Sequence, residues 1–216
     1  MKPLILDIET GPDDQAIQRL GHKIEPDKRL KDQTKIEADL RNKAEKYKAE
    51  SALRAERGRI ICIGMLQADT VEILEGSEKD MLPRAWERIR GAHNAGCVLV
   101  GHNIVGFDLP FLARRSMLLG IHVPSWVGEG LRRDAMVNDT MLIWACGVYG
   151  ERISLRDLGI ACGFAAKDDI GPRFSAVYAE HRDQALQYLD NDLRLTEAVF
   201  NQITGWPSRS IRDDEN

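Results

Sequence analysis

A buried β-strand is predicted by the first stretch of the chain, Leu4-Ile5-Leu6-Asp7-Ile8-Glu9-Thr10-Gly11. Its apolar residues stand at consecutive positions, which is typical of a strand covered on both faces. Residues two apart point to the same side of a strand, so Asp7 and Glu9 project together, roughly 6 to 7 Å apart along the backbone. Two anions held that close favour a divalent cation between them. The alternative is a strand end at which the aspartate caps the following turn.

A third carboxylate, Asp108, stands between a second apolar run and a predicted helix. The run covers residues 97–101 and predicts another buried strand, and the helix is predicted over residues 110–119. An aspartate before a helix with proline in its first turn is typical of an N-cap, and capping alone would account for it. The polar pair His102-Asn103 at the strand end, followed by a bend at Gly106, instead favours a carboxylate that faces the same edge of the sheet as the first two.

A fourth carboxylate, Asp192, lies on a predicted helix whose buried stripe is marked by leucines at spacings of three and four. Asp192 lies about 60° from the centre of that stripe, and Tyr188 stands one turn before it on the same side. Asp190 falls about 100° away on the other side, so we expect Asp192 to be half-buried and Asp190 to be solvated. A salt bridge to an arginine is the alternative role for Asp192.

Together the three segments resemble the motifs of the DEDD superfamily of 3′–5′ exonucleases. The motifs match in order and in setting: D-x-E at Asp7 and Glu9, N-x3-F-D at Asn103, Phe107 and Asp108, and Y-x3-D at Tyr188 and Asp192. The histidine type would need His at position 187, which is Gln, so the chain resembles the tyrosine (DEDDy) type found in family-B DNA polymerase proofreading domains and their free-standing relatives. The resemblance covers most of residues 1–205, except a segment from about 13 to 57.

The resemblance implies two divalent metal ions, Mg²⁺ or Mn²⁺, held by the four carboxylates. Asp7 would bridge both ions, and Glu9 and Asp192 would help to fix them. Asp108 would bind directly or through water. The chemistry agrees, because phosphodiester hydrolysis is served by two such ions about 3.5 to 4 Å apart, and hard cations prefer oxygen ligands. Tyr188, whose unperturbed pKa is about 10, is a poor base at neutral pH, so its hydroxyl is expected to orient the attacking water.

The resemblance also implies where nucleic acid binds. Asn103 and Phe107 would line the pocket for the terminal nucleotides, where an aromatic ring stacks on a base. Thr10 would lie near the terminal 3′-hydroxyl.

Asp139, followed by Thr140, is typical of a helix start.

The element pattern predicts an α/β, ribonuclease-H-like three-layer fold, with a mixed central sheet flanked by helices and a charged helical insertion. Three early strands suggest an antiparallel meander, and a fourth, after a helix, would join in parallel. We expect an exonuclease domain over 1–207 that contains the 13–57 insertion, followed by a flexible tail over 208–216. The expected strands are 3–9, 59–66, 70–75 and 97–102, and the expected helices are 35–57, 79–94, 110–119, 140–147, 154–162 and 180–204.

The insertion contains the densest basic segment of the chain. Residues 28–59 hold 11 Lys and Arg against 6 Asp and Glu, a net of +5 in a chain whose total is −4. Its apolar stripe is thin, which favours a solvated helix stabilised by ion pairs. The alternative is an arm that leans over the active site and holds the nucleic-acid backbone. The basic residues expected to do so are Lys31, Lys35, Arg41, Lys43 and Lys46.

Other function classes find no support in the 216 residues. The chain lacks the phosphate-binding pattern G-x4-G-K-[ST], and Gly128-Glu129-Gly130 lacks the third glycine of a dinucleotide fingerprint. Its four cysteines show no disulfide spacing and are expected to be buried, reduced thiols. With no signal peptide and no apolar stretch near 18 residues, a soluble cytoplasmic protein without membrane contact is expected.

The sequence therefore predicts a free-standing exonuclease that shortens single-stranded DNA from the 3′ end. Partners would be the DNA ends themselves and a separate polymerase or recombination and repair proteins, with a role in DNA repair. Two alternatives stay open: an exonuclease directed at RNA, because the same metal chemistry serves either backbone, and a catalytically silent ribonuclease-H-like module that only binds nucleic acid.

Overall fold

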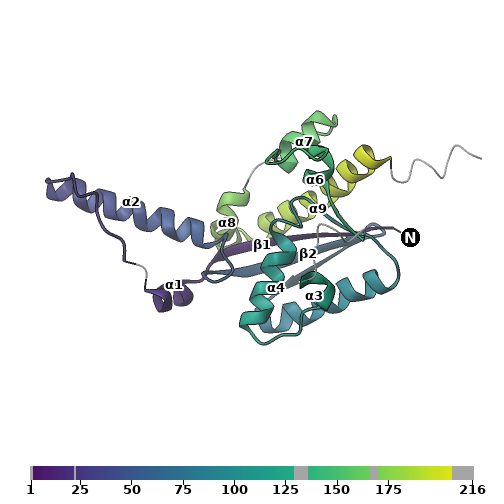
Figure 1. Cartoon of the computed structure of the whole chain (residues 1–216), viewed down its shortest axis with the longest axis horizontal. Helices are drawn as coiled ribbons and strands as arrows, with labels where there is room; N and C mark the ends of the chain where they lie inside the picture. The colour runs from purple at the N-terminus through teal and green to yellow at the C-terminus, as the bar shows by residue number, and fades with distance from the viewer. Residues whose placement is uncertain (1, 22, 129–135, 166–169, 206–216) are drawn as a thin grey trace, which may run out of the picture.

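The computed structural model describes residues 2–21, 23–128, 136–165 and 170–205 (Figure 1). Its strands form one five-stranded sheet in the order β3-β2-β1-β4-β5. Their bounds are Leu4–Pro12 (β1), Gly58–Gln67 (β2), Thr70–Glu75 (β3), Leu99–Gly101 (β4) and Val137–Asp139 (β5). The first three strands pair antiparallel, β4 runs parallel to β1, and β5 runs parallel to β4. The predicted meander with a parallel fourth strand is confirmed.

Helices cover both faces of this sheet, which completes the predicted three layers (Figure 1). On one face, α3 (Glu78–Asn94) and α4 (Asp108–Leu118) pack around the fully buried Trp86. On the other face, α8 (Phe174–Glu180) and α9 (Arg182–Thr204) pack through Phe174 and Leu189. The remaining helices are α1 (Asp14–Leu20), α2 (Gln33–Ser51), α5 (Ser125–Gly128), α6 (Thr140–Ala145), α7 (Leu155–Ala161) and the short 3₁₀ helix η2 (Gly171–Arg173). None of the described helices has the length and apolar character needed to cross a membrane.

The short elements β5, α1, α5 and α8 are absent from the sequence-based prediction. Each has between three and seven residues. The helix expected over 35–57 ends at Ser51, because the amides of Ala52, Leu53 and Arg54 bond to carbonyls three residues back and tighten the chain into a turn. The predicted tail, 208–216, lies outside the described residues.

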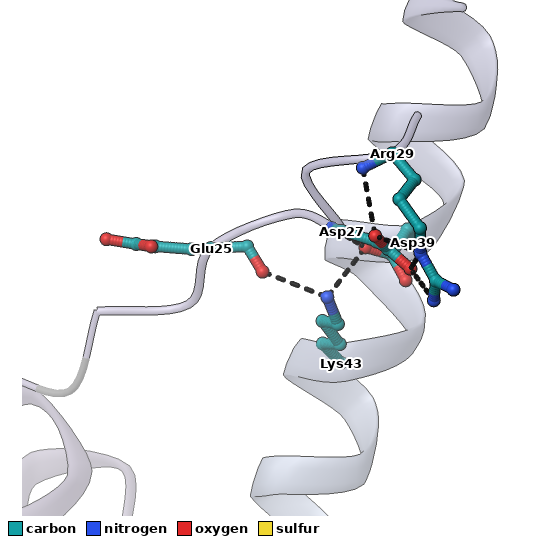
Figure 2. A network of polar contacts seen from close by, with 5 residues as sticks. All are labelled: Glu25, Asp27, Arg29, Asp39 and Lys43. Atoms are coloured by element: carbon teal, nitrogen blue, oxygen red, sulfur yellow. Dashed lines mark hydrogen bonds and ion pairs between the residues drawn. The ribbon is translucent and has the colours of Figure 1, made fainter. Parts of the chain in front are cut away.

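The insertion forms an arm made of α1, α2 and the segment between them, and α2 extends away from the body (Figure 1). A polar network ties the connecting segment to α2 (Figure 2). Lys43 donates to the Glu25 carbonyl at 3.0 Å and pairs with Asp39 at 2.8 Å, and Asp39 also accepts the Asp27 amide. Arg29 holds the pKa of the Asp27 carboxyl below its usual range. The arm is therefore stabilised by its own opposite charges.

The four cysteines are free thiols, as predicted, but they are not all buried. Cys62 and Cys97 are buried, whereas Cys146 is exposed. Cys146 ends α6 in the left-handed conformation (φ 48°), and helix ends of this kind lie at the surface.

Candidate metal centre

The site begins with the alternation of side chains along β1. Leu4 and Leu6 belong to the core under α3 and α4, whereas Ile5 belongs to the core under α9. The odd-numbered Asp7 and Glu9 therefore face α9. Asp192, on α9, completes a trio in which one carboxylate oxygen from each residue lies within 4.8 Å of the other two. The structure thus brings together residues 185 positions apart, as the motif pattern predicted.

Close packing of α9 against the sheet makes this approach possible. Asp7 pairs across the sheet with Gly64 of β2. A Cβ atom built on Gly64 would lie 2.9 Å from Leu189 Cγ and 2.9 Å from Leu193 Cδ1, nearer than real Cβ contacts allow. Both leucines lie on α9 and flank Asp192. The missing side chain at Gly64 therefore sets how near α9, and with it Asp192, comes to Asp7.

Asp192 is more deeply buried than the sequence predicted, with only 8% of its surface exposed. Asp190, which was expected to be solvated, is partly buried and pairs with Arg194 at 3.0 Å. The half-buried Tyr188 lies one turn before Asp192 and contacts Phe174 of α8, with ring centroids 6.3 Å apart at 55°. Its ring is thus held between α8 and α9.

Asp108 is buried at the start of α4 and does not cap that helix. Phe107 occupies the N-cap position, and Asp108 Oδ1 instead accepts the backbone amide of Ile8 at 3.0 Å. Burial raises the pKa of the Asp108 carboxyl well above its usual range, and the nearby charge of Asp7 raises it further. Asp108 therefore lies directly behind β1, between the two acidic residues of that strand, although it is not a member of the trio.

A buried aspartate that the sequence marked only as a helix start organises the loop before Asp108. Asp139 caps α6, as predicted, by accepting the Met141 and Leu142 amides. It also accepts the amides of Asn103 at 2.9 Å and Val105 at 3.1 Å. No local pattern predicts these two bonds, because they depend on β5 lying next to β4. Asp139 thus fixes the turn that leads into Phe107 and Asp108.

Two cavities adjoin at Phe107, and the smaller one is lined by a carboxylate of the trio. The smaller, of about 480 Å³, is lined by Glu9 and Thr10 of β1. The larger, of about 790 Å³, is lined by Asn103 and by the segment from Met141 to Arg152. Phe107 lines both. The three residues expected to meet the terminal nucleotides therefore do line adjoining hollows.

The five basic residues of the arm divide into two groups. Lys43 and Lys46 pair with acidic residues of α2, at 2.8 and 3.9 Å. The side chains of Lys31, Lys35 and Arg41 are exposed. Lys35 lies roughly 24 Å along the helix from Ser51, and the helix points away from the sheet (Figure 1). In the described chain it is the C-terminal end of α2 that reaches the carboxylates.

The donor set fits a hard divalent cation. The trio offers carboxylate oxygens, which Mg²⁺ and Mn²⁺ prefer, and its oxygens are close enough to share one ion. Burial and the neighbouring charges of Glu9, Glu75 and Asp7 raise the pKa of the Cys62 thiol, so this cysteine, which pairs with Glu9 across the sheet, stays neutral. A thiol is a poor ligand in that form.

A comparison with solved structures places the fold. The chain is similar to a family B DNA polymerase from the hyperthermophilic archaeon Pyrobaculum calidifontis, with a TM-score of 0.55 and 15% sequence identity. The match covers 94% of this chain and 24% of the polymerase, so the chain spans about a quarter of that protein's length. This likeness identifies a ribonuclease-H-like fold of the kind found in the polymerase's exonuclease domain.

The chain belongs to a family described as predicted 3′–5′ exonucleases related to the exonuclease domain of PolB, whose model matches residues 40–188. That match starts inside the arm and includes Asp108 and Tyr188. No curated protein matches the chain.

Proposed function

We propose that this protein is a metal-dependent 3′–5′ exonuclease that removes nucleotides from single-stranded DNA ends by two-metal-ion hydrolysis. The observation that carries the proposal is the trio Asp7, Glu9 and Asp192: one carboxylate oxygen of each lies within 4.8 Å of the others, and Glu9 lines one of two adjoining cavities. Carboxylates held this close to one another favour a bound cation, because their like charges repel and a divalent ion between them relieves that repulsion. Family membership supplies the direction of cleavage.

Each residue of the site has a part in this proposal. Asp7, Glu9 and Asp192 would hold the divalent ions, with Asp108 supporting them from behind β1 directly or through water. The bound ions would supply positive charge for the developing phosphorane and would acidify a water molecule. Tyr188, held against Phe174, would orient the attacking water through its hydroxyl.

The substrate end would lie in the smaller cavity. Thr10 would contact the terminal 3′-hydroxyl there, and Phe107 and Asn103 would contact the terminal bases. Lys31, Lys35, Arg41, Lys43 and Lys46 would bind the phosphates of more distant nucleotides. The exonuclease would act in DNA repair in the cytoplasm, together with a separate polymerase or with recombination and repair proteins.

The test is digestion of 5′-labelled single-stranded DNA, and of RNA with the same sequence, in Mg²⁺, in Mn²⁺ and in chelator. We expect a ladder that shortens from the 3′ end of DNA, requires metal, and is lost in Asp192→Asn by at least 10³-fold. The matched control is Asp190→Asn on the same helix, which lies outside the trio and should retain activity. A ladder from RNA alone would reassign the substrate. No cleavage in any metal, with DNA binding intact, would indicate a silent binding module.

The arm is tested separately by the salt dependence of DNA binding. A Lys35→Ala, Arg41→Ala double variant should lower the magnitude of the slope of log K against log salt by about 1.4 on single-stranded DNA if each residue contacts one phosphate. The control is the double variant of Lys79 and Arg90, exposed cations of α3. Equal slopes for the two variants would show that the arm is only a solvated helix.

A further inference from the structure

One acidic residue outside the trio joins three elements of the fold. Glu75 ends β3, and its carboxylate accepts hydrogen bonds from Arg182 of α9, through Nε at 2.9 Å and through Nη2. The same carboxylate accepts the hydroxyl of Tyr178 on α8. Burial and the bond to Glu75 raise the pKa of Tyr178, so its hydroxyl keeps its proton and remains a donor. Two helices are thus tied to one strand end.

This network lies on the same row of the sheet as Glu9. Glu75 pairs across the sheet with Cys62, and Cys62 pairs with Glu9. Opposed residues of antiparallel strands point to the same face, so both glutamates face α9 with one strand between them. Burial raises the pKa of the Cys62 thiol, the charges of the two glutamates raise it further, and the charge of Arg182 lowers it. The network is therefore close to one carboxylate of the metal trio.

The corner between α8 and α9 is also a wall of the site. Only His181 separates the two helices, so a bond to Arg182 restrains both of them. Ser175 of α8 lines the smaller cavity together with Glu9. A Cβ atom built on Gly11 of β1 would lie 2.9 Å from Ser175 Oγ, so α8 packs tightly against the end of that strand. A shift of this corner would therefore change the site itself.

A row of three aromatic rings leads from the network to Tyr188. Tyr178 stacks on Phe174, with ring centroids 6.0 Å apart at 22°, and Phe174 contacts Tyr188. Phe174 is fully buried, and close-packed interiors pass displacements from one side chain to the next. Glu75 holds the first ring at its hydroxyl. A change at that hydroxyl should consequently reach the ring of Tyr188.

Stability alone gives a poor account of the network. Arg182 leaves 54% of its side chain exposed, and ion pairs with such exposure contribute little to the free energy of unfolding. A guanidinium that binds a carboxylate through two nitrogens does, however, fix both distance and angle. The network therefore suits a role in positioning.

We propose that Glu75, Tyr178 and Arg182 form a clamp that positions Tyr188 against the metal centre. The clamp holds the corner of α8 and α9 on its row of the sheet, and the ring of Phe174 passes that position to Tyr188. The three members are positioning residues, which act through Tyr188. Loosening the clamp slows the chemical step and leaves DNA binding unchanged. This inference rests on the proposed function.

The first experiment measures kcat and KM of the full chain on single-stranded DNA in Mn²⁺. Tyr178→Phe removes one hydroxyl and keeps the ring, and Arg182→Ala removes the two-pronged pair. We expect each to lower kcat about tenfold and to change KM by less than about twofold. The matched control is Arg194→Ala, which breaks the pair with Asp190 on the same helix at a similar exposure, and it should behave as wild type. The side chains removed are partly exposed, so each variant should stay folded at the assay temperature.

Combination with Tyr188→Phe separates positioning from a general loss of structure. Tyr188→Phe alone should lower kcat about 10²-fold. If the clamp acts through the Tyr188 hydroxyl, adding Arg182→Ala to this variant should change kcat by less than about twofold. A residue that only supports the fold would lower kcat by the same factor in both backgrounds.

A second readout does not require activity. The chain has four tyrosines, so protein labelled with 3-fluorotyrosine gives four ¹⁹F resonances, and Tyr188→Phe assigns one of them. Arg182→Ala should move the resonances of Tyr178 and Tyr188 and leave the other two in place. Arg194→Ala should leave all four in place.

Each outcome decides one of the two ideas or both. A loss of kcat in Arg182→Ala that disappears in the Tyr188→Phe background supports the clamp. The same loss in both backgrounds, or equal activity of Arg182→Ala and Arg194→Ala, overturns the clamp and leaves the proposed function in place. No cleavage by wild-type protein overturns the proposed function; the clamp then stands if Arg182→Ala moves the Tyr188 resonance, and an unmoved resonance overturns it too.

Discussion

Replacing Gly64 by alanine should damage the candidate metal centre without altering any of its carboxylates. Gly64 lies opposite Asp7 in the sheet, and its φ angle is not among the positive ones, so alanine fits the backbone itself. The new methyl group would lie 2.9 Å from Leu189 Cγ and 2.9 Å from Leu193 Cδ1. Leu189 Cγ is the branch atom of a fully buried side chain, so rotating only its terminal methyl groups does not relieve the contact. We expect α9 to move outwards and to carry Asp192 away from Asp7.

The expected change in the free energy of unfolding of Gly64→Ala follows from two opposing effects. Restricting the unfolded chain by replacing glycine stabilises a protein by about 0.4 to 1 kcal/mol. Overpacking a filled core destabilises it by about 1 to 3 kcal/mol. The contacts at Gly64 are too short for the first effect to prevail, so we expect a net loss of about 1 to 2 kcal/mol. In a domain of this size that corresponds to a fall in Tm of about 2 to 8 °C.

The assays are thermal unfolding with and without Mn²⁺, and cleavage of single-stranded DNA. Gly64→Ala should lower Tm in chelator, should weaken the stabilisation by Mn²⁺, and should reduce kcat by about tenfold or more, since a displacement near 1 Å at the reacting centre has effects up to about 100-fold. The control is Gly91→Ala in α3, where a Cβ atom meets nothing within 4 Å. That change should raise stability by about 1 kcal/mol. A Gly64→Ala variant that is stabilised and fully active would refute the packing argument.

Three further predictions concern the surroundings of the site. Arg115→Met removes the ion-pair partner of Glu78 and should lower the free energy of unfolding in denaturant by about 3 to 5 kcal/mol. The control is Arg114→Met, at an exposed position of the same helix, which should change that free energy by less than about 0.5 kcal/mol. Asp108→Asn should stabilise the protein in chelator at neutral pH while abolishing cleavage. Because the carboxyl pKa of Asp108 is raised, the folded state holds the proton more tightly, and native stability falls as pH rises between the unfolded and folded pKa values. The stability gained in Asp108→Asn should therefore vanish below about pH 4, and a gain that persists there would exclude the raised pKa as its cause. Gly106→Ala places a methyl group 2.2 Å from Asn103 Oδ1, so the amide must turn away, and we expect KM for DNA to rise at nearly unchanged Tm; an unchanged KM would remove Asn103 from the binding surface.

Local patterns were enough to predict four of the five strands and the approach of Asp7, Glu9 and Asp192 to one another. The alternation in β1 placed Asp7 and Glu9 on one face because strand geometry has a fixed period of two. The helical period likewise placed Tyr188 on the side of Asp192. The motif order supplied Asp108, which neither period could have distinguished from an ordinary helix cap.

Other features depend on contacts between segments that are distant in the chain, and no local pattern encodes them. Whether Asp108 caps α4 or accepts the Ile8 amide depends on α4 lying beside β1, a separation of 100 residues. Asp139 could be predicted to cap α6, but its two bonds to the loop before Asp108 exist only because β5 pairs with β4. The depth of Asp192 was underestimated for a similar reason, since Gly64 on another strand decides how closely α9 packs.

The sequence by itself therefore indicated the chemistry of the candidate site: four carboxylates and a tyrosine in an order and spacing that resemble the motifs of the DEDD exonucleases, on elements whose periods are local properties of the backbone. Only the tertiary structure decided how those groups act together. It set the distance between Asp7 and Asp192, the buried position of Asp108, and the contact of Tyr188 with Phe174, because each depends on side chains of different elements competing for the same space.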